Sequence, residues 1–250
     1  MEPENRIERP AGAVQTNYTV TERETDAGGL MRPSALLRAM QLASWANLAP
    51  HGLDCEALLE RGLLWMLVRT GLELRRLPRR GETVQIRTWW SEEKHWMFSC
   101  RYQCFSETGE LLASAASLWA LAARMTRSLA SPEALGDAFP DVRLPDGPEL
   151  PARRMPFPDT LPGLAYRTVQ SEEIDLNGHM NNTCYLDWAM ELPELEILRG
   201  KKLCRVWVEY GMELLEGQQS ENRYALEGNK LFLRGFRDGE NTFSLCAEYD

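Results

Sequence analysis

The chain contains few of the residues that build metal centres or disulfide frameworks. It has 3 histidines and 6 cysteines among 250 residues, and no two cysteines form a Cys-x-x-Cys pair. This spacing predicts no zinc site, and the scattered thiols are expected to be reduced. No apolar run approaches the ~20 residues that span a bilayer, and the acidic start lacks the apolar core of a signal peptide. We therefore expect a cytoplasmic protein.

Positive charge is scarce as well. Lys and Arg number 28 against 37 Asp and Glu, which gives a net charge of -9 and a pI of about 5.1. Such an acidic chain argues against a generic nucleic-acid binder, although local basic clusters remain possible. Hydrophobic residues make up 44% of the chain and aromatic residues 9%, which predicts a globular protein of one large domain or two ordinary ones.

Proline is concentrated in one stretch, where eight of the 14 prolines lie between Ser131 and Gly163. Proline fixes the backbone angle φ and lacks an N–H donor, so this stretch is expected to run extended over a surface and to join no sheet interior. The sequence therefore predicts a polar N-terminal tail (1–15), an N-terminal domain (16–131), a Pro-rich linker (132–164) and a C-terminal domain (165–250).

The two predicted domains resemble each other at an offset of 149 residues, which brings Asp26-Ala-Gly-Gly-Leu-Met31 onto Asp175-Leu-Asn-Gly-His-Met180. Each half begins with a short alternating strand, turns at Asp and Gly, and enters a helix. In the first half this helix is expected from Ser34 to about Leu48, because apolar residues recur along one side. After each helix only strand patterns are expected, at 65–74, 83–90, 96–106 and 111–122, and at 204–214, 223–226, 231–236 and 242–249.

One helix followed by four antiparallel strands, twice, predicts an α+β fold. We expect a tandem, or double, hotdog, in which each half is a long helix wrapped by a curved antiparallel sheet. The same offset places Gly28 and Leu30 where the second half has Asn177 and His179. The first half thus lacks the polar groups, and we expect one active site per chain, in the second half, with the first half as a substrate wall.

The candidate chemistry lies in residues 175–191. Asp175, Asn177 and His179 alternate around Gly178, just before an amphipathic stretch with roughly helical spacing. At a helix N-terminus, free N–H groups and the helix dipole favour developing negative charge. The trio offers donors for an oxyanion, a group that handles protons and a carboxylate to orient it, as acyl transfer or hydrolysis requires. Each residue alone fits an Asx-rich turn that caps a helix equally well.

Several further motifs occur in a fixed order along the chain, and this order is what makes them specific. They are Trp65-Met-Leu-Val-Arg69, Leu74-Arg-Arg-Leu-Pro78-Arg-Arg-Gly81-Glu82, Ile86-Arg-Thr88-Trp89, Ser117-Leu-Trp119 and Asp175-x-Asn177-x-His179-x-Asn181-Asn182-x-x-Tyr185-x-x-Trp188. From about Tyr18 to Tyr249 the chain thus resembles the acyl-acyl carrier protein thioesterases, double-hotdog enzymes that end fatty acid synthesis.

The resemblance implies four catalytic residues, Asp175, Asn177, His179 and Glu213. Glu213 comes from a Tyr-x-x-Glu pattern that begins at Tyr210. In plant members a Cys follows this Glu, whereas Leu214 stands there in this chain. A thiol nucleophile would have to be Cys184, which we expect to be a packed core residue.

In the expected mechanism the Glu213 carboxylate activates a water that attacks the thioester carbonyl, so that no metal or cofactor is needed. Asn177 and N–H groups near the helix start hold the acyl oxygen. His179 donates a hydrogen bond or passes the proton to the leaving sulfur, and Asp175 orients the pair. Strand alternation from Val206 to Leu214 would place Glu209 and Glu213 on one face. Spacing alone leaves both as candidate bases, and only the family register selects Glu213.

The implied partner, acyl carrier protein, is acidic, so docking would require a local basic patch. The candidate clusters, which an ordinary polar rim would explain as well, are Arg75, Arg76, Arg79 and Arg80, and Lys201, Lys202 and Arg205. Two alternatives stay open: a hotdog thioesterase that acts on acyl-coenzyme A, and a hotdog protein that binds acyl thioesters without hydrolysing them. A monomer and a homodimer are equally compatible with the sequence, which does not give the acyl chain length.

Overall fold

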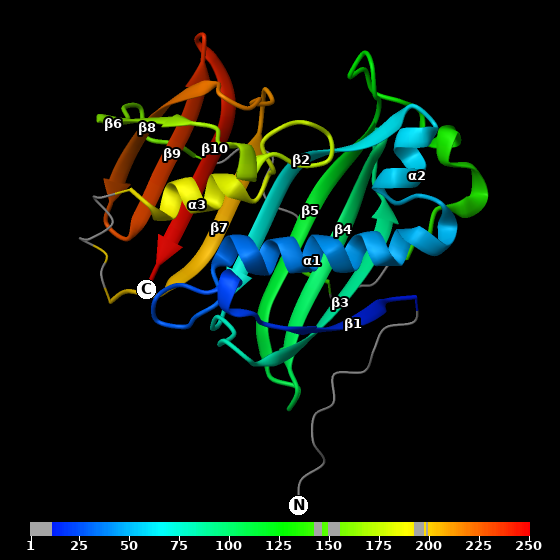
Figure 1. Ribbon diagram of the computed structural model, residues 1–250, viewed down its shortest axis with the longest axis horizontal. Helices are drawn as coiled ribbons and strands as arrows, with labels where there is room; N and C mark the ends of the chain where they lie inside the picture. The colour runs from blue at the N-terminus through cyan, green and yellow to red at the C-terminus, as the bar shows by residue number, and fades with distance from the viewer. Residues whose placement is uncertain (1–11, 143–146, 150–155, 193–197, 199) are drawn as a thin grey trace, which may run out of the picture. The chain divides into compact units, whose positions relative to one another are not determined.

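The computed structural model describes residues 12–142, 147–149, 156–192, 198 and 200–250 (Figure 1). The chain divides into two compact units, residues 1–67 with 74–150, and residues 68–73 with 151–250. Parts of the predicted tail (1–11) and of the predicted linker (143–146 and 150–155) lie outside the described residues. The division into four segments stays a prediction.

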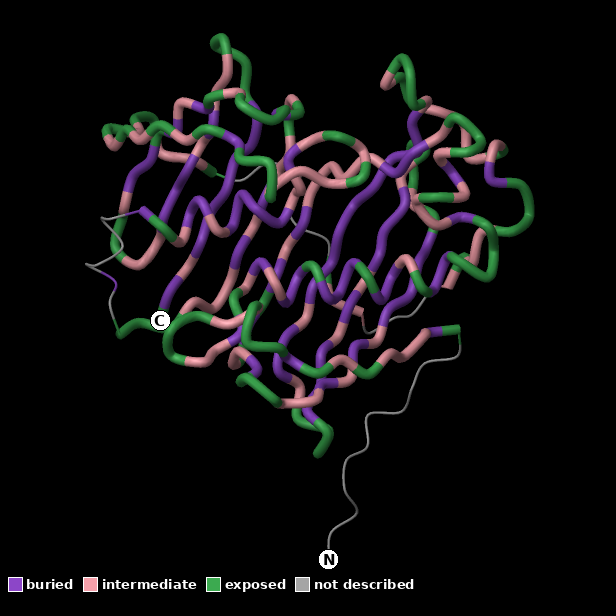
Figure 2. Tube along the Cα trace, viewed as in Figure 1, coloured by how far each residue is buried: buried purple, intermediate pink, exposed green. Residues whose placement is uncertain are grey.

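The first unit is an antiparallel sheet packed against a long helix. Its strands lie in the order β1 (Val14–Thr19), β3 (Thr83–Glu92), β4 (Met97–Ser106), β5 (Leu111–Ala123) and β2 (Leu63–Leu74). Residues 68–73 of β2 belong to the second unit. Helix α1 (Pro33–Leu48) begins with proline at its first position, where the missing N–H costs nothing. Leu36, Leu37 and Met40 are buried residues of this helix, which contacts β3 of the sheet. Buried and exposed stretches alternate along α1 (Figure 2). The expected helix and all four strands are confirmed to within three residues at each end.

The described part of the first unit also contains the short helical segments η1 (Glu22–Glu24), η2 (Ala49–His51) and η3 (Pro132–Ala138). The expectation that only strands follow α1 is wrong, because α2 (Cys55–Glu60) comes between α1 and β2. The Asp54 side chain caps α2 by accepting the Ala57 N–H at 2.9 Å. Six residues are too few for a helical period to stand out in the sequence.

Large aromatic rings fill much of the interior between α1 and its sheet. Trp65 stacks on Trp90 at 5.3 Å between ring centroids, and Trp45 meets Trp119 edge-on at 5.1 Å. The Trp119 indole N–H donates to Ser117 at 2.7 Å, so this polar atom is satisfied inside the core. The rings therefore act as packing residues of the first unit.

The second unit has the same plan with fewer residues. Its strands lie in the order β7 (Leu203–Tyr210), β10 (Glu240–Tyr249), β9 (Lys230–Arg237), β8 (Gln219–Glu227) and β6 (Gly163–Thr168). Residues 69–73 of β2 pair antiparallel with β7. Helix α3 (Cys184–Met190) follows η4 (Ser171–Glu173) and packs Tyr185 and Trp188 against Phe243 of β10. The described part of this helix is shorter than the long helix that we expected.

The sequence offset is reproduced in the backbone hydrogen bonds. Asp26 N–H donates to the Leu30 carbonyl at 2.8 Å, and Asp175 N–H donates to the His179 carbonyl at 2.9 Å. Isolated bridges Thr25–Met31 and Ile174–Met180 close the two turns in the same way. Each unit thus holds one copy of the same closed loop between its first strand and its helix, and the predicted α+β architecture is confirmed.

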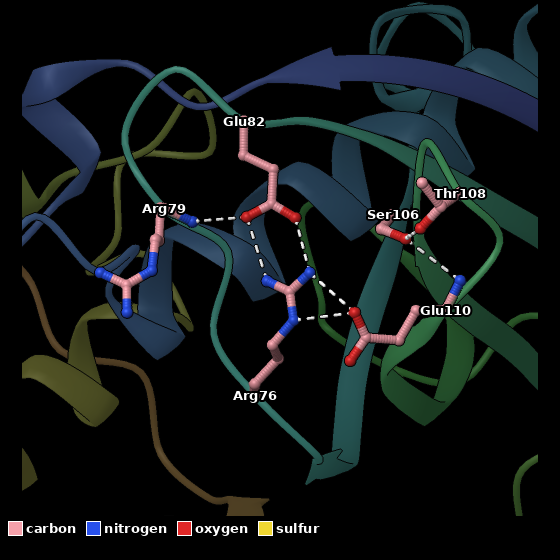
Figure 3. Close-up of polar contacts among 6 residues, drawn as sticks. All are labelled: Arg76, Arg79, Glu82, Ser106, Thr108 and Glu110. Atoms are coloured by element: carbon pink, nitrogen blue, oxygen red, sulfur yellow. Dashed lines mark hydrogen bonds and ion pairs between the residues drawn. The ribbon is translucent and has the colours of Figure 1, made fainter.

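A second pair of matched turns lies at residues 79–82 of the first unit and 215–218 of the second. In the first unit, Glu82 accepts the Arg79 N–H at 2.9 Å and two hydrogen bonds from Arg76, which also contacts Glu110 (Figure 3). The hydrogen bonds from Arg76 hold the pKa of the Glu82 carboxyl below its ordinary value.

In the second unit an amide occupies the place of Glu82. Gln218 accepts the Leu215 N–H at 2.9 Å and a hydrogen bond from Arg237 of β9. The two turns therefore share their geometry, whereas a carboxylate holds the first and a neutral side chain holds the second.

Candidate active site

Asp175, Asn177 and His179 lie on a loop that its own hydrogen bonds close. The Asp175 carboxylate accepts the Asn177 N–H at 2.8 Å, and its carbonyl accepts the Gly178 N–H at 3.0 Å. Gly178 has φ of 81°, a left-handed conformation that favours glycine. Asp175 therefore shapes the turn that carries the other two side chains.

This loop does not lie at a helix N-terminus, contrary to the sequence expectation. Helix α3 begins at Cys184 with Thr183 as its N-cap. The Thr183 N–H donates to the Asn181 side chain at 3.0 Å, and the Cys184 N–H donates to the Asn181 carbonyl at 3.0 Å. The Thr183 and Cys184 N–H groups are therefore already used. The loop itself carries side-chain donors for an acyl oxygen in Asn177 and His179.

His179 and Glu213 form a close pair in the second unit. The distance from His179 Nε2 to Glu213 Oε2 is 3.1 Å. The His179 side chain is 13% exposed and the Glu213 side chain 42%, so the imidazole is largely enclosed while the carboxylate reaches solvent. The Met180 N–H donates to the Leu214 carbonyl at 2.8 Å and joins the two backbone segments next to the pair.

Glu209 lies elsewhere, and the expected shared face with Glu213 is wrong. Strand β7 ends at Tyr210, so the alternation does not continue to Glu213. The Tyr210 ring lies 5.8 Å from that of Tyr185 and thus on the α3 side of the sheet. Because neighbouring residues of a strand point to opposite faces, Glu209 is directed away from α3. Of the two carboxylates, only Glu213 is brought to His179.

Tyr210, the first residue of the Tyr-x-x-Glu pattern, is hydrogen-bonded to the segment that follows the loop. Its hydroxyl donates to the Asn182 carbonyl at 3.2 Å. Burial raises the pKa of Tyr210 above its ordinary value, so the phenol stays protonated and keeps this hydrogen bond.

Cys184 is a buried residue of α3, 5% exposed. Its Sγ lies 3.9 Å from the carbonyl oxygen of Glu173. This burial agrees with the expected packed thiol.

The corresponding loop of the first unit keeps the turn and its carboxylate but has Gly28 and Leu30 in place of Asn177 and His179. Its carboxylate, Asp26, accepts the Leu30 N–H at 2.9 Å. A Cβ added at Gly28 would lie 3.2 Å from Asp26 Oδ1, so a larger side chain there would crowd the carboxylate. The site residues that the sequence predicted thus gather in the second unit alone.

Two negative findings hold for the part of the chain that the structure describes. No three His, Cys, Asp or Glu side chains are grouped so that they could hold a metal ion. In the same residues, no helix has the length and apolar character needed to cross a membrane.

The fold and the single polar loop define a double-hotdog protein with one candidate hydrolytic site. Models of the acyl-ACP thioesterase N-terminal and C-terminal domains match residues 12–133 and 165–235. These matches cover more than half of the chain, which therefore belongs to the acyl-ACP thioesterase family.

Solved structures support the same fold. An acyl-ACP thioesterase from Bacteroides thetaiotaomicron has a TM-score of 0.82 at 20% identity and covers 96% of this chain and 98% of its own. The 12:0-ACP thioesterase from Umbellularia californica has a TM-score of 0.81 at 20% identity, with 96% and 97% covered. The predicted double hotdog is confirmed.

Curated relatives are similar over part of their length. A chloroplastic acyl-[acyl-carrier-protein] hydrolase of Cuphea viscosissima is 27% identical over 182 residues, which are 68% of this chain and 43% of the relative. A chloroplastic palmitoyl-acyl carrier protein thioesterase of Cuphea hookeriana is 29% identical over 62% of this chain and 39% of its own. The chain spans about half or less of the length of these relatives.

Sequence reasoning missed Glu173, which joins several parts of the site. A local signal was present, because Gln170 and Glu173 form a capping box at η4, with a polar side chain three residues before a Glu. The motif occurs before a helix of only three residues, and its link to α3 is a tertiary contact that no local pattern contains.

Proposed function

We propose that this protein hydrolyses fatty acyl-acyl carrier protein thioesters to free fatty acid and carrier protein, and so terminates fatty acid synthesis. The observation that carries the proposal is the His179–Glu213 pair, 3.1 Å apart. Asn177 lies on the same loop as His179, whereas the matched loop of the first unit has Gly28 and Leu30 at these two positions. Membership of the acyl-ACP thioesterase family and the names of the curated relatives support the same substrate class.

In the proposed mechanism Glu213 takes a proton from a water that attacks the thioester carbonyl carbon. The exposed carboxylate can reach solvent, which this role requires. The Asn177 amide donates to the oxygen that becomes negatively charged. When the carbon–sulfur bond breaks, the proton that Glu213 took from water passes through His179 to the thiolate of the carrier. Asp175 acts through the loop, because it holds the Asn177 backbone rather than the imidazole.

The basic clusters give limited support for docking an acidic carrier protein. Arg76 is engaged by Glu82 and Glu110, and Arg80 lies 3.8 Å from Glu22. The remaining exposed charges of that cluster are Arg75 and Arg79. Because these ion pairs engage Arg76 and Arg80, acyl-coenzyme A stays the second candidate substrate: an acyl-coenzyme A ester requires no protein surface for docking.

Arg205 is likewise engaged, by Glu73 and Glu248, whereas Lys201 and Lys202 are exposed. The exposed cations that each unit, taken by itself, offers to an acidic carrier protein are therefore Arg75 and Arg79 in the first unit and Lys201 and Lys202 in the second. We further propose a cytoplasmic enzyme that needs no cofactor, with a monomer and a homodimer both compatible.

The test is a hydrolysis panel with carrier-protein and coenzyme A esters of the same acyl chains, from about eight to eighteen carbons. We expect turnover of both, with a higher kcat/KM for the carrier-protein ester. Equal or higher kcat/KM for the coenzyme A ester would favour the second candidate. Tight binding of acyl thioesters without any turnover would show a non-catalytic binding protein.

A further inference from the structure

Glu173 connects the candidate catalytic loop to its surroundings through four contacts. One carboxylate oxygen accepts the Trp188 indole N–H at 2.6 Å, and the other accepts the Gln170 N–H at 2.8 Å. The Glu173 carbonyl accepts the Asn181 N–H at 2.7 Å and lies 3.9 Å from Cys184 Sγ. A single residue thus joins the segment before the loop, the residue after it and helix α3.

These contacts enclose the polar trio. Glu173 and Asn181 flank the loop on either side, and their hydrogen bond closes the ring that the Ile174–Met180 bridge begins. Within this ring lie Asn177 and His179. The Trp188 contact then ties the ring to α3, where the Trp188 ring packs against Phe243 of the sheet. The position of the imidazole relative to the sheet therefore depends on Glu173.

The first unit shows which contact is particular to the active half. Glu24 occupies the place of Glu173, and it accepts the Thr21 N–H at 2.7 Å and, through its carbonyl, the Arg32 N–H at 2.8 Å. Its second carboxylate oxygen accepts the Tyr18 hydroxyl from β1. Ala39 stands where the second unit has Trp188, so the tie from the carboxylate to the helix occurs in the second unit only.

The chemistry of the tie makes it strong. The donor is a buried indole N–H and the acceptor a carboxylate, and such charge-assisted hydrogen bonds are about twice as strong as neutral ones. Glutamine cannot replace the carboxylate, because its NH₂ group would face one of the two N–H donors. The loss would leave a buried donor unsatisfied and let the loop shift relative to α3.

We propose that Glu173 is a positioning residue, which sets the geometry of the His179–Glu213 pair through Trp188. The proposal rests on the proposed hydrolytic function for its kinetic consequence. Its geometric consequence, the placement of the imidazole, holds for any activity of the site.

The kinetic arm compares Glu173→Gln and Trp188→Phe, alone and combined, with Glu24→Gln as the matched control. We expect each single variant of the second unit to lower kcat about ten- to hundredfold with KM within about twofold, since misplaced catalytic groups cost rate rather than binding. The kcat of the double variant should be no lower than that of the slower single variant, because both substitutions remove the same hydrogen bond between Glu173 and Trp188. Glu24→Gln should keep the wild-type kcat.

The second arm measures the NMR signals of the His179 imidazole directly and does not require enzymatic activity. Because the chain has 3 histidines, the His179 ring signals can be assigned by NMR with His51→Gln and His95→Gln variants. Glu173→Gln and Trp188→Phe should shift or broaden the His179 signals, while Glu24→Gln should leave them unchanged. If Glu173→Gln fails to fold, Trp188→Phe, which keeps an aromatic ring, carries the test.

Two results would overturn the proposal. One is a folded Glu173→Gln protein with wild-type kcat and unchanged His179 signals. The other is an equal loss of kcat in Glu24→Gln, which would show a general effect on stability. An inactive wild-type protein would instead refute the proposed function, and the NMR arm would still decide whether Glu173 places the imidazole.

Discussion

Replacement of His179 by alanine is expected to lower kcat by about 10² or more while the protein remains folded. The imidazole lies 3.1 Å from the Glu213 carboxylate and can carry a proton to the leaving sulfur. The hydrogen bonds of the loop run through the His179 backbone, so truncation of the side chain leaves them in place. Steady-state kinetics together with a thermal melt measure the two quantities.

Two variants serve as controls for this result. His51→Gln changes an exposed histidine of the first unit and should be nearly neutral. Cys184→Ala should retain activity, and no acyl-enzyme should accumulate, because a water rather than a thiol attacks the carbonyl. A burst of product with an acyl adduct trapped on Cys184 would contradict the proposed mechanism and restore a thiol nucleophile.

Asn177→Ala is expected to reduce turnover by about 10² to 10³, the usual effect of removing one oxyanion donor. The turn itself should survive, because Asp175 holds the Asn177 backbone N–H and not its side chain. Binding of the acyl thioester should also survive, since the substitution removes a polar group and no apolar contact with the acyl chain. Single-turnover kinetics measure the rate, and calorimetric titration with a non-hydrolysable acyl analogue measures the affinity.

The matched control is Asp26→Asn in the first unit. An asparagine oxygen can still accept the Leu30 N–H, so this variant keeps the turn and should alter activity only modestly. The titration should give one site per chain. Two equivalent sites, or a strong loss of activity in folded Asp26→Asn, would show that the two halves are not specialised as we propose.

Local sequence was sufficient for features that local contacts determine. The offset between the halves was visible because Asp26 and Asp175 use the same backbone bonds to close the same turn. The strand pattern was visible because alternation records which face of a sheet is buried. The fold class followed from these two regularities.

Features that depend on distant contacts were not predictable in this way. A Cβ at Gly211 would lie 2.3 Å from the Asn241 carbonyl, and this close approach of two chain segments accompanies the end of β7. The start of α3 at Cys184 depends on Asn181, whose side chain accepts the Thr183 N–H and whose own N–H donates to the Glu173 carbonyl, eight residues earlier. The contact between His179 and Glu213 joins segments that are far apart in sequence, so only the family register pointed to it.

Glu82 holds its turn in the first unit, and Gln218 holds the matched turn in the second. The stability of the first turn therefore depends on the protonation of a carboxylate, whereas that of the second does not. The Glu82 carboxyl has a lowered pKa in the folded unit, so it binds a proton less readily there than in the unfolded chain. It stabilises the first unit above the unfolded-state pKa of about 4.3, and this stabilisation is lost as the pH falls through the lowered pKa.

Gln218 does not titrate, so the turn next to Glu213 keeps its hydrogen bonds in the same range. Amide hydrogen exchange, followed as the pH is lowered from about 5 to 3, should show protection lost in β1 and β3 before β6 and β8. Glu82→Gln should narrow this difference, and simultaneous loss in the wild-type protein would contradict it. The half with the candidate catalytic groups is thus built on the turn that tolerates acid.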